Sequence, residues 1–222
     1  MSQEKHTFTK FDDDLTSIRV HILEMCGLIE MQFKQSMQAL LESNVKIARQ
    51  VVDQDYSVNH LEVRIDSLCV SAIARQQPAA SDLQSILIAM KFVMHLERIG
   101  DEAKKIARIA ERLAHQNHLA RKRFSRVSLD AELAQQRLEE VIDSFTRLDT
   151  FTAYKLLGSE ELINEEFSLI FRDLVQSMTD HPHTISSSIE ILFVAKAIER
   201  IGSHINHIAN LVINASNRYS EI

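Results

Sequence analysis

The sequence contains no tryptophan, only two prolines and only four glycines among its 222 residues. Proline and glycine are the residues that most often interrupt regular structure, so their scarcity leaves little room for turns and favours a few long helices. Hydrophobic residues make up 45% of the chain and charged residues 25%, a balance that excludes a disordered protein. We therefore expect an all-α globular protein.

Cysteine and long apolar runs are scarce as well. Cys26 and Cys69 lie in apolar stretches without a nearby thiol partner, which predicts two buried free thiols and fits a reducing cytosol. The first residues are polar rather than basic and then apolar, so they do not resemble a signal peptide. No uncharged apolar run approaches the roughly 18 residues that span a bilayer. We expect a cytoplasmic protein that reaches a membrane only through partners.

Positive charge is in the minority, with a net charge of −6 and an isoelectric point near 5.9. This balance argues against nucleic acid as a partner. One basic group stands out between the two halves of the chain, and we interpret the surrounding residues 119–128 as a solvated connector. The group consists of Arg121, Lys122, Arg123 and Arg126.

Apolar residues recur every three or four positions along most of the chain, which predicts amphipathic helices. In the first half we expect helices over 15–41, 45–75 and 81–115, and Ser81 and Asp82 supply an N-cap and an acidic first turn for the last one. In the second half we expect helices over 129–148, 150–179 and 186–216.

The two halves repeat the same plan. Asn59 and Asn164 lie 105 residues apart, Pro78 and Pro182 lie 104 apart, and Glu97 and Glu199 lie 102 apart. Such constant separations indicate an internal duplication with only small insertions or deletions. The sequence therefore predicts two tandem three-helix bundles with six long helices, the first over 8–118 and the second over 129–217.

One motif is unfavourable for a helix and still occurs twice. HLERIGDEAKKIAR, residues 95–108, contains a central glycine, which costs about 1 kcal/mol in a helix. Glu97 and Asp101 add a like-charge pair one turn apart, costing roughly 0.2–0.5 kcal/mol. The pattern returns as AIERIGSHINHIAN, residues 197–210. We expect Gly100 and Gly202 to allow a close approach to the helix backbone, and the motif to form a cation-binding and docking face.

The carboxylates of the first copy have two interpretations. They can form a solvated face in which Asp101 pairs with Lys104 or Lys105, or they can hold a cation between them. The same helix carries Ile86, Met90, Val93 and Met94 on or beside the face of Glu97, so it has a second apolar surface to be covered by another chain or a ligand.

Further ligands are needed if a cation binds, because one helix cannot complete its coordination shell. Glu62 and Asp66, together with Asn59, share one face of the second helix and are candidates, although a plain hydrophilic stripe explains them equally well. Oxygen ligands suit hard or borderline cations, so we consider magnesium, manganese, iron or zinc. In the second copy Glu199 is retained, but the other polar positions are neutral or histidine: Ser203, His204, Asn206, His207 and Asn210. His204 and His207 can ligate a metal, although a histidine on a helix is more often a surface or hydrogen-bonded residue.

Three stretches resemble the PhoU family of bacterial phosphate-signalling regulators. They are NHLEVRID at 59–66, ARQQPAASDL at 74–83 and LERIGDEAKKIA at 96–107. The segment AIERIGSHINHIANLVI at 197–213 resembles the second signature of that family, and residues 10–30 are similar to its first helix. The resemblance covers nearly the whole chain.

The resemblance implies two three-helix bundles that bind metal at Glu/Asp-x-x-x-Asp motifs and commonly form a homodimer. It also implies a cytoplasmic negative regulator without enzymatic activity, which links the ATPase of a phosphate ABC transporter to a sensor histidine kinase. The metal-binding residues it implies are Glu97, Asp101 and Glu199, with Glu62 and Asp66 as further candidates. Departures from the family pattern occur at His95, Asn164, Ser203 and Asn210, so a full cluster in the second half is in doubt.

Two other functions remain open at this point. The chain can serve a different phosphate permease, since partner choice depends on surfaces that the sequence does not rank. A carboxylate metalloenzyme built on a helical bundle would require Glu-x-x-His motifs on two helices. No glutamate in this chain has histidine three residues later, which argues against that enzyme.

Overall fold

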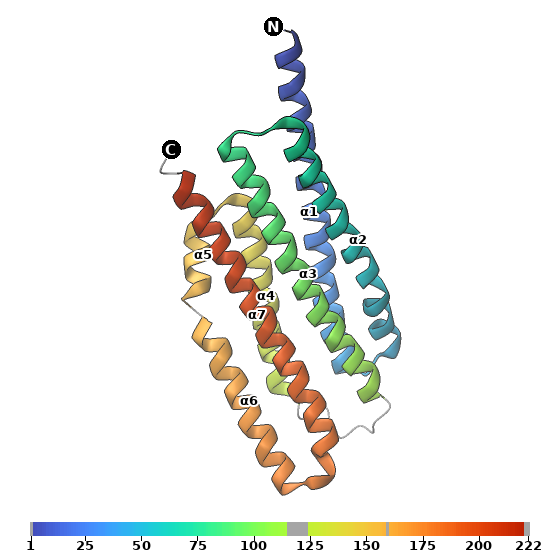
Figure 1. Ribbon diagram of the computed structural model, residues 1–222. Coiled ribbons are helices and arrows are strands. Elements are labelled where there is room, and N and C mark those ends of the chain that lie inside the picture. Colours follow the sequence, from blue (N-terminus) through green and yellow to red (C-terminus); the bar gives the residue numbers. More distant parts are fainter. Residues whose placement is uncertain (1, 115–123, 159, 220–222) are drawn as a thin grey trace.

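The computed structural model describes residues 2–114, 124–158 and 160–219, and these ranges are helical apart from short turns (Figure 1). Their helices divide into two groups along the chain. The first group is α1 (Ser2–Glu42), α2 (Val45–Gln76) and α3 (Ala80–Ala114). The second group is α4 (Phe124–Arg147), α5 (Thr150–Leu157), α6 (Glu160–Asp180) and α7 (Ile185–Tyr219), with a 3-10 turn at Pro182–Thr184 before α7.

The break at Pro78 is confirmed. Helix α2 ends at Gln76, because proline disfavours right-handed helical geometry for the residue before it. Gln77 caps the helix in a left-handed conformation with φ of 44°, and its amide donates to the carbonyl of Ile73. The next helix starts earlier than expected: the amide of Leu83 donates to the carbonyl of Ala79 at 2.9 Å. Ser81 therefore lies inside α3, and its predicted role as an N-cap is wrong, whereas the predicted acidic first turn is confirmed at Asp82.

The second half contains one more helix than the sequence suggested. We predicted a single helix over 150–179, but α5 ends at Leu157 and α6 begins at Glu160, running in a different direction (Figure 1). Gly158 lies at this break, and glycine is a poor helix former. Helix α4 also begins at Phe124, so residues 124–128 are helical rather than connector. Residues 119–123 lie outside the described ranges.

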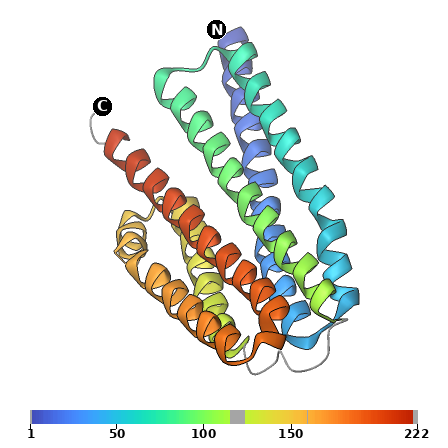
Figure 2. The ribbon, with the colours of Figure 1, turned by 60° about the horizontal axis from the view of Figure 1, so that its bottom comes forward.

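Helices α3 and α7 are neighbours at the centre of the molecule and run antiparallel (Figures 1 and 2). Two ion pairs join them: Arg112 with Glu190 at 2.7 Å and Arg200 with Glu102 at 3.3 Å. Helices α1 and α2 pack on one side of α3, and α4, α5 and α6 pack around α7. The duplicated third helices thus hold the two halves together.

This arrangement changes the interpretation of the second apolar surface on α3. Ile86 and Val93 are each only 1% exposed, because both side chains are buried in the hydrophobic core of this chain. The expectation that another chain or a ligand covers it is wrong for these two residues. Met94, by contrast, remains 45% exposed.

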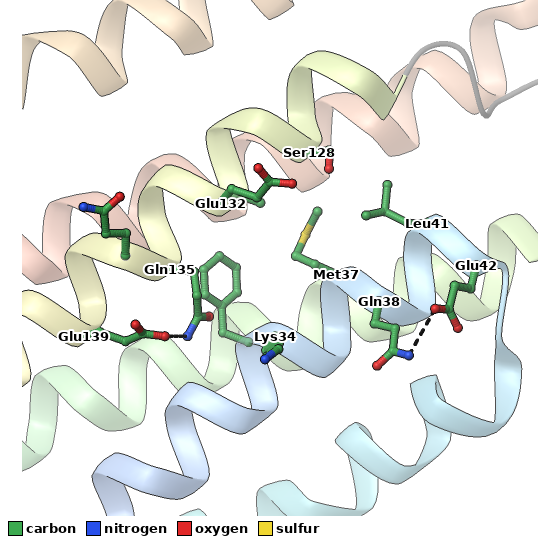
Figure 3. A pocket seen from close by; sticks show the side chains of 12 residues that line it. Lys34, Met37, Gln38, Leu41, Glu42, Ser128, Glu132, Gln135 and Glu139 are labelled. Atoms are coloured by element: carbon green, nitrogen blue, oxygen red, sulfur yellow. Dashed lines mark hydrogen bonds between the residues drawn. The ribbon is translucent and has the colours of Figure 1, made fainter.

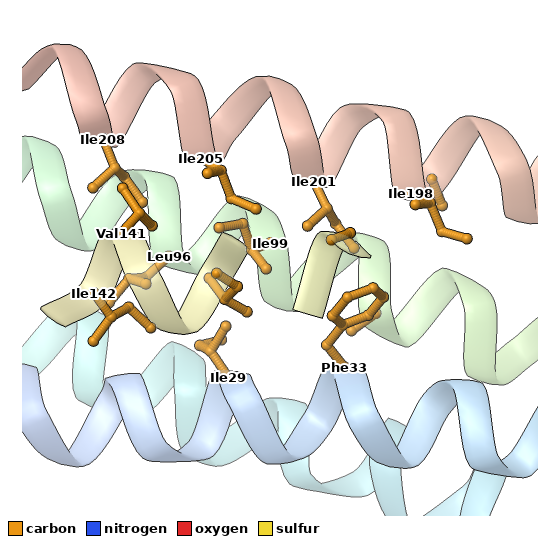
Figure 4. Close-up of a cluster of buried hydrophobic side chains, with 14 of the residues drawn as sticks. Ile29, Phe33, Leu96, Ile99, Val141, Ile142, Ile198, Ile201, Ile205 and Ile208 are labelled. Atoms are coloured by element: carbon orange, nitrogen blue, oxygen red, sulfur yellow. The ribbon is translucent and has the colours of Figure 1, made fainter. Parts of the chain in front are cut away.

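One hydrophobic core runs through both halves (Figure 4). Ile99 and the apolar residues around it on α3, which are Phe92, Leu96, Ala103 and Ile106, are buried, and residues from α1, α4 and α7 extend the cluster. Cys26 and Cys69 are buried free thiols, as expected. No helix in the described ranges is both long enough and apolar enough to cross a membrane. The labelled core residues in Figure 4 are Ile29, Phe33, Leu96, Ile99, Val141, Ile142, Ile198, Ile201, Ile205 and Ile208.

The second half also buries a charged group. Arg137 on α4 is 4% exposed and donates to the carbonyl of Leu156 at 2.7 Å and to Oδ1 of Asn206 at 3.3 Å. Asp130, two turns earlier on α4, is 3% exposed, and neither of its carboxyl oxygens has a hydrogen-bond partner among the described residues. Burial, reinforced by the charge of Glu166, raises the pKa of Asp130 to about 6, although Arg137 opposes this shift.

We expect Asp130→Asn to stabilise the protein at neutral pH. Because the folded-state pKa lies above the ordinary value of 3.8, the carboxyl of Asp130 lowers native stability progressively as the pH rises from about 4 to about 6. The gain from the substitution should therefore be of order 2–3 kcal/mol at neutral pH and should disappear below about pH 4. Urea unfolding of both proteins across this range measures it, and a gain independent of pH would show that the buried charge is not its cause.

Candidate metal centre

Glu97 and Asp101 lie one turn apart on the face of α3 that borders α2. Their side chains are 15% and 31% exposed, and they share a hydrogen bond. Burial, reinforced by the charges of Asp101 and Glu62, raises the pKa of Glu97 to about 7 against the opposing effect of Arg98. The strain between two carboxylates, expected from the sequence, is therefore present in the structure.

Helix α2 contributes a third carboxylate to this group. Burial raises the pKa of Glu62, as do the charges of Asp66 and Asp101, while Arg98 lowers it. Asp66 is exposed one turn further along α2 and acts on Glu62. Asn59 does not join the group, since its amide donates to Oδ2 of Asp55 at 3.3 Å. The structure thus brings together Glu62, Glu97 and Asp101, with Asp66 at the edge.

The partners of these carboxylates differ from those we expected. Arg98 lies 3.4 Å from Glu97 and 3.9 Å from Asp101, but its side chain is 58% exposed. The lysines expected to pair with Asp101 are engaged elsewhere: Lys104 with Asp55, and Lys105 with Glu102 at 2.8 Å. One solvent-exposed arginine therefore faces three carboxylates, and solvent screens much of its charge.

The donor chemistry of this group fits a hard or borderline cation, because carboxylate oxygens are the ligands that such ions prefer. In residues 2–114, 124–158 and 160–219, no three histidine, cysteine, aspartate or glutamate side chains are already gathered closely enough to hold a metal ion. A cation here would draw the carboxylates together and would keep several water ligands.

Gly100 lies beneath the carboxylate face and allows the close packing predicted for it. A Cβ atom at this position would lie 2.7 Å from Cδ1 of Ile29 and 3.2 Å from Oε1 of Gln32, both on α1. Ile29 and Gln32 are fully buried, so neither side chain can move easily. Gly202 is likewise buried within α7. The glycine of the first motif serves the packing of its own bundle.

The second copy of the motif is built differently. Glu199 on α7 pairs with Lys196 at 2.5 Å, whereas the position equivalent to Lys196 in the first copy is Met94. Lys196 also lies 5.1 Å from the ring centre of Phe167. By the separation of Asn59 and Asn164, Phe167 and Phe171 correspond to Glu62 and Asp66. A lysine and two aromatic rings thus replace the carboxylate neighbours.

The neutral polar residues of the second copy serve structural contacts. Asn206 is 5% exposed and accepts a hydrogen bond from Arg137. Asn210 donates to the carbonyl of Asn206 at 3.1 Å. Asn164 has a side chain outside the described part of the structure. Glu199 is therefore the remaining carboxylate of its motif, and its charge is offset by a lysine.

Comparison with known proteins agrees with this two-part architecture. The model of the PhoU domain matches the chain twice, at residues 22–110 and 129–212. The chain belongs to the PhoU family.

Several PhoU proteins are similar over nearly the full length. The phosphate-specific transport system accessory protein PhoU homolog of Pseudomonas aeruginosa is 36% identical over 94% of this chain and 86% of its own length. The PhoU accessory protein of Escherichia coli is 34% identical over 96% of this chain and 87% of its own.

Solved PhoU structures share the fold. The crystal structure of PhoU from Pseudomonas aeruginosa aligns with a TM-score of 0.90 at 36% identity, covering 93% of this chain and 99% of that one. The phosphate transport system regulatory protein PhoU from Streptococcus pneumoniae aligns with a TM-score of 0.84 at 21% identity, over 93% and 96% of the two chains, and supports the fold alone.

A cluster of three histidines in this PhoU chain was missed in the sequence analysis. His95 on α3 faces His204 and His207 on α7, with Nδ1 of His95 3.3 Å from Nδ1 of His204. His204 and His207 were considered as ligands, but His95 was seen only as a departure from the family pattern. The missing signal was the antiparallel pairing of α3 and α7, which brings His95 to the other two.

A surface groove of about 420 Å³ lies between α1 and α4 (Figure 3). Its apolar lining includes Phe33, Met37 and Leu41. Polar side chains at its edge hydrogen-bond along their own helices, as Gln38 does to Glu42 at 3.1 Å. The groove contains no arrangement of catalytic or ligand groups comparable with the carboxylate cluster.

Proposed function

We propose that this protein is a non-enzymatic, cytoplasmic negative regulator of the phosphate-starvation response. In this function it links the ATPase of a phosphate ABC transporter to a sensor histidine kinase and modulates phosphate uptake. The observation that carries the proposal is the match of a PhoU domain to each half of the chain. The relatives named above are accessory proteins of phosphate-specific transport systems, which supports the same assignment.

The cation site of this regulator is the cluster of Glu62, Glu97 and Asp101, with Asp66 as a further ligand. Support comes from the raised pKa of Glu97 and Glu62, which reflects carboxylates crowded on one partly buried face. A bound magnesium, manganese, iron or zinc ion would relieve this repulsion. Glu199 is a weaker candidate, because Lys196 already offsets its charge.

Deletion of the gene tests the regulatory function. A reporter driven by a phosphate-starvation promoter should become active in phosphate-rich medium, and a plasmid copy of the gene should restore repression. Continued full repression in the deletion strain would refute the proposed role. A pull-down from native lysate should recover the transporter ATPase and the histidine kinase, whereas recovery of another phosphate permease would assign the chain to that system.

We expect Glu97→Gln combined with Asp101→Asn to reduce bound metal without disturbing the fold. Both changes keep the size of the side chains, remove two ligands and abolish the repulsion between them. Elemental analysis of purified wild-type and variant protein measures the loss, and far-ultraviolet circular dichroism monitors the helices. Equal metal content in both proteins would remove this cluster as the cation site.

Metal binding should also differ between the two halves. The matched variant Glu199→Gln removes the equivalent carboxylate of the second copy, where Lys196 and Phe167 replace acidic neighbours. We expect this variant to retain nearly all of the metal that the wild type holds. A loss as large as that caused by the Glu97 and Asp101 changes would show that both halves bind metal equally.

A further inference from the structure

Three histidines meet where α3 and α7 pack together. The ring centres of His95 and His207 are 5.1 Å apart, those of His95 and His204 are 5.5 Å apart, and those of His204 and His207 are 6.1 Å apart. His95 and His204 are about half-buried, whereas His207 is exposed. This cluster is separate from the carboxylates, which face α2.

The packing of α3 against α7 places the three histidines side by side. His204 and His207 lie three residues apart and so occupy one face of α7. His95 reaches them from α3, which packs against α7 through the shared core and through the ion pairs of Arg112 with Glu190 and of Arg200 with Glu102. The central position of α3 and α7 is visible in Figures 1 and 2. Packed helices therefore bring the three rings to one place.

The distance between the Nδ1 atoms of His95 and His204 matches the distance between two nitrogen ligands of one metal ion. Zinc binds imidazole nitrogen at about 2.0–2.1 Å in tetrahedral geometry, which places two ligand nitrogens roughly 3.3–3.4 Å apart. The Nδ1 atoms of His95 and His204 are 3.3 Å apart. The rings do not yet surround a common point. His207 is exposed, however, so it can rotate toward the other two without leaving a cavity in the core.

The charges around the cluster permit a cation. Arg98, Arg200 and Lys105 lie close enough to influence His204, but each is paired with a carboxylate. Arg98 contacts Glu97 and Asp101, and both Arg200 and Lys105 contact Glu102. All three basic side chains are at least half-exposed, at 50–58%, so water screens what charge remains.

We propose that His95, His204 and His207 form a binding site for a borderline transition-metal ion such as Zn²⁺. Three imidazole ligands with an open fourth position, filled by water, suit zinc, cobalt, nickel or copper and do not suit Mg²⁺. The ion would join α3 to α7 and thereby the first half of the chain to the second. This site differs from the proposed carboxylate site in its ligands, and it pairs α3 with α7 rather than with α2.

The test uses full-length protein freed of metal by a chelator and titrated with CoCl₂, because tetrahedral Co²⁺ with nitrogen ligands absorbs visible light strongly. We expect the absorption to saturate at one equivalent and to vanish when Zn²⁺ displaces the cobalt. His95→Gln, His204→Gln and His207→Gln should each weaken binding at least tenfold. His60→Gln, which changes an exposed histidine on α2, is the matched control and should bind as the wild type does.

Two results would overturn the proposal. One is the absence of a saturable visible spectrum in the wild-type protein. The other is unchanged cobalt affinity in His95→Gln, particularly if Glu97→Gln with Asp101→Asn abolishes binding, since the ion would then sit at the carboxylates. The ring-proton NMR signals of the wild-type protein give an answer without any variant: three histidines should broaden on addition of one equivalent of Co²⁺, and a different set would refute the assignment.

Discussion

Gly100→Val should lower the free energy of unfolding by about 3 kcal/mol or more. A Cβ atom at this position would lie 2.7 Å from Cδ1 of Ile29 and 3.2 Å from Oε1 of Gln32, and both residues are fully buried. Overfilling a packed core costs about 1–3 kcal/mol, occasionally more, and valine adds two further carbons. Urea unfolding followed by circular dichroism measures the change.

Gly27 provides the matched control for this variant. It lies in α1, and nothing within 4 Å would meet a Cβ atom there. Gly27→Ala should therefore stabilise the protein by up to about 1 kcal/mol, the ordinary gain from replacing glycine inside a helix. If Gly100→Ala produced the same gain, close packing at Gly100 would not be the reason for its presence.

A double variant identifies the atom responsible. Ile29→Val removes Cδ1 alone and should cost about 0.5–1.5 kcal/mol by itself. Gly100→Ala should destabilise the wild type by about 1 kcal/mol, because overpacking outweighs the gain in helix propensity. In the Ile29→Val background the same change should be neutral or stabilising. Additive effects of the two substitutions would mean that Gln32, not Ile29, is the obstacle.

Phe92→Ala should destabilise the protein by about 3–5 kcal/mol, the range for deleting a buried phenylalanine. Phe92 on α3 is fully buried, and its ring stacks on Phe145 of α4 with centres 3.7 Å apart. The pair joins the first half of the chain to the second. Thermal and urea unfolding measure the loss, and Phe193→Ala, at a 57% exposed site on α7, should change stability by less than about 0.5 kcal/mol.

The shape of the unfolding curve gives a second prediction for Phe92→Ala. Because one core cluster spans both halves, the wild type should unfold in a single transition. Phe92→Ala weakens the contact between the halves more than either core, so its transition should broaden or divide. A variant with wild-type stability would show that the stacked rings contribute little to joining the halves.

The sequence was sufficient to predict the fold because the signals for helices and for the duplication were local and repeated. Scarce breakers, apolar periodicity and constant separations between Pro78 and Pro182 or Glu97 and Glu199 predict two helical bundles, and the structure confirms them. The break between α5 and α6 was missed because the apolar period continues across Gly158. A single glycine is a weak signal in a pattern that is otherwise helical.

The site was harder to predict because its contacts join distant parts of the chain. Periodicity placed Glu97 and Asp101 on one face and made Glu62 on α2 a candidate ligand, but it did not show that Glu62 lies opposite them. It also left the partner of Asp101 open: Arg98 approaches it, while Lys104 turns to Asp55. The meeting of His95 with His204 depends on the register of α3 against α7, which a pattern within one helix does not contain.

The antiparallel helices α3 and α7 make reciprocal contacts, in which equivalent positions of the two repeats face each other as they would across a two-fold axis. Glu102 of the first repeat contacts Arg200 of the second. The equivalent positions are His204 and Arg98, and the charge of Arg98 lowers the pKa of His204. Such reciprocal contacts are those of a symmetric dimer. In a dimer of identical chains every substitution occurs twice, at both ends of the axis. Fusion of two repeats into one chain removes that constraint, so one half can keep Asp101 while the other carries Ser203.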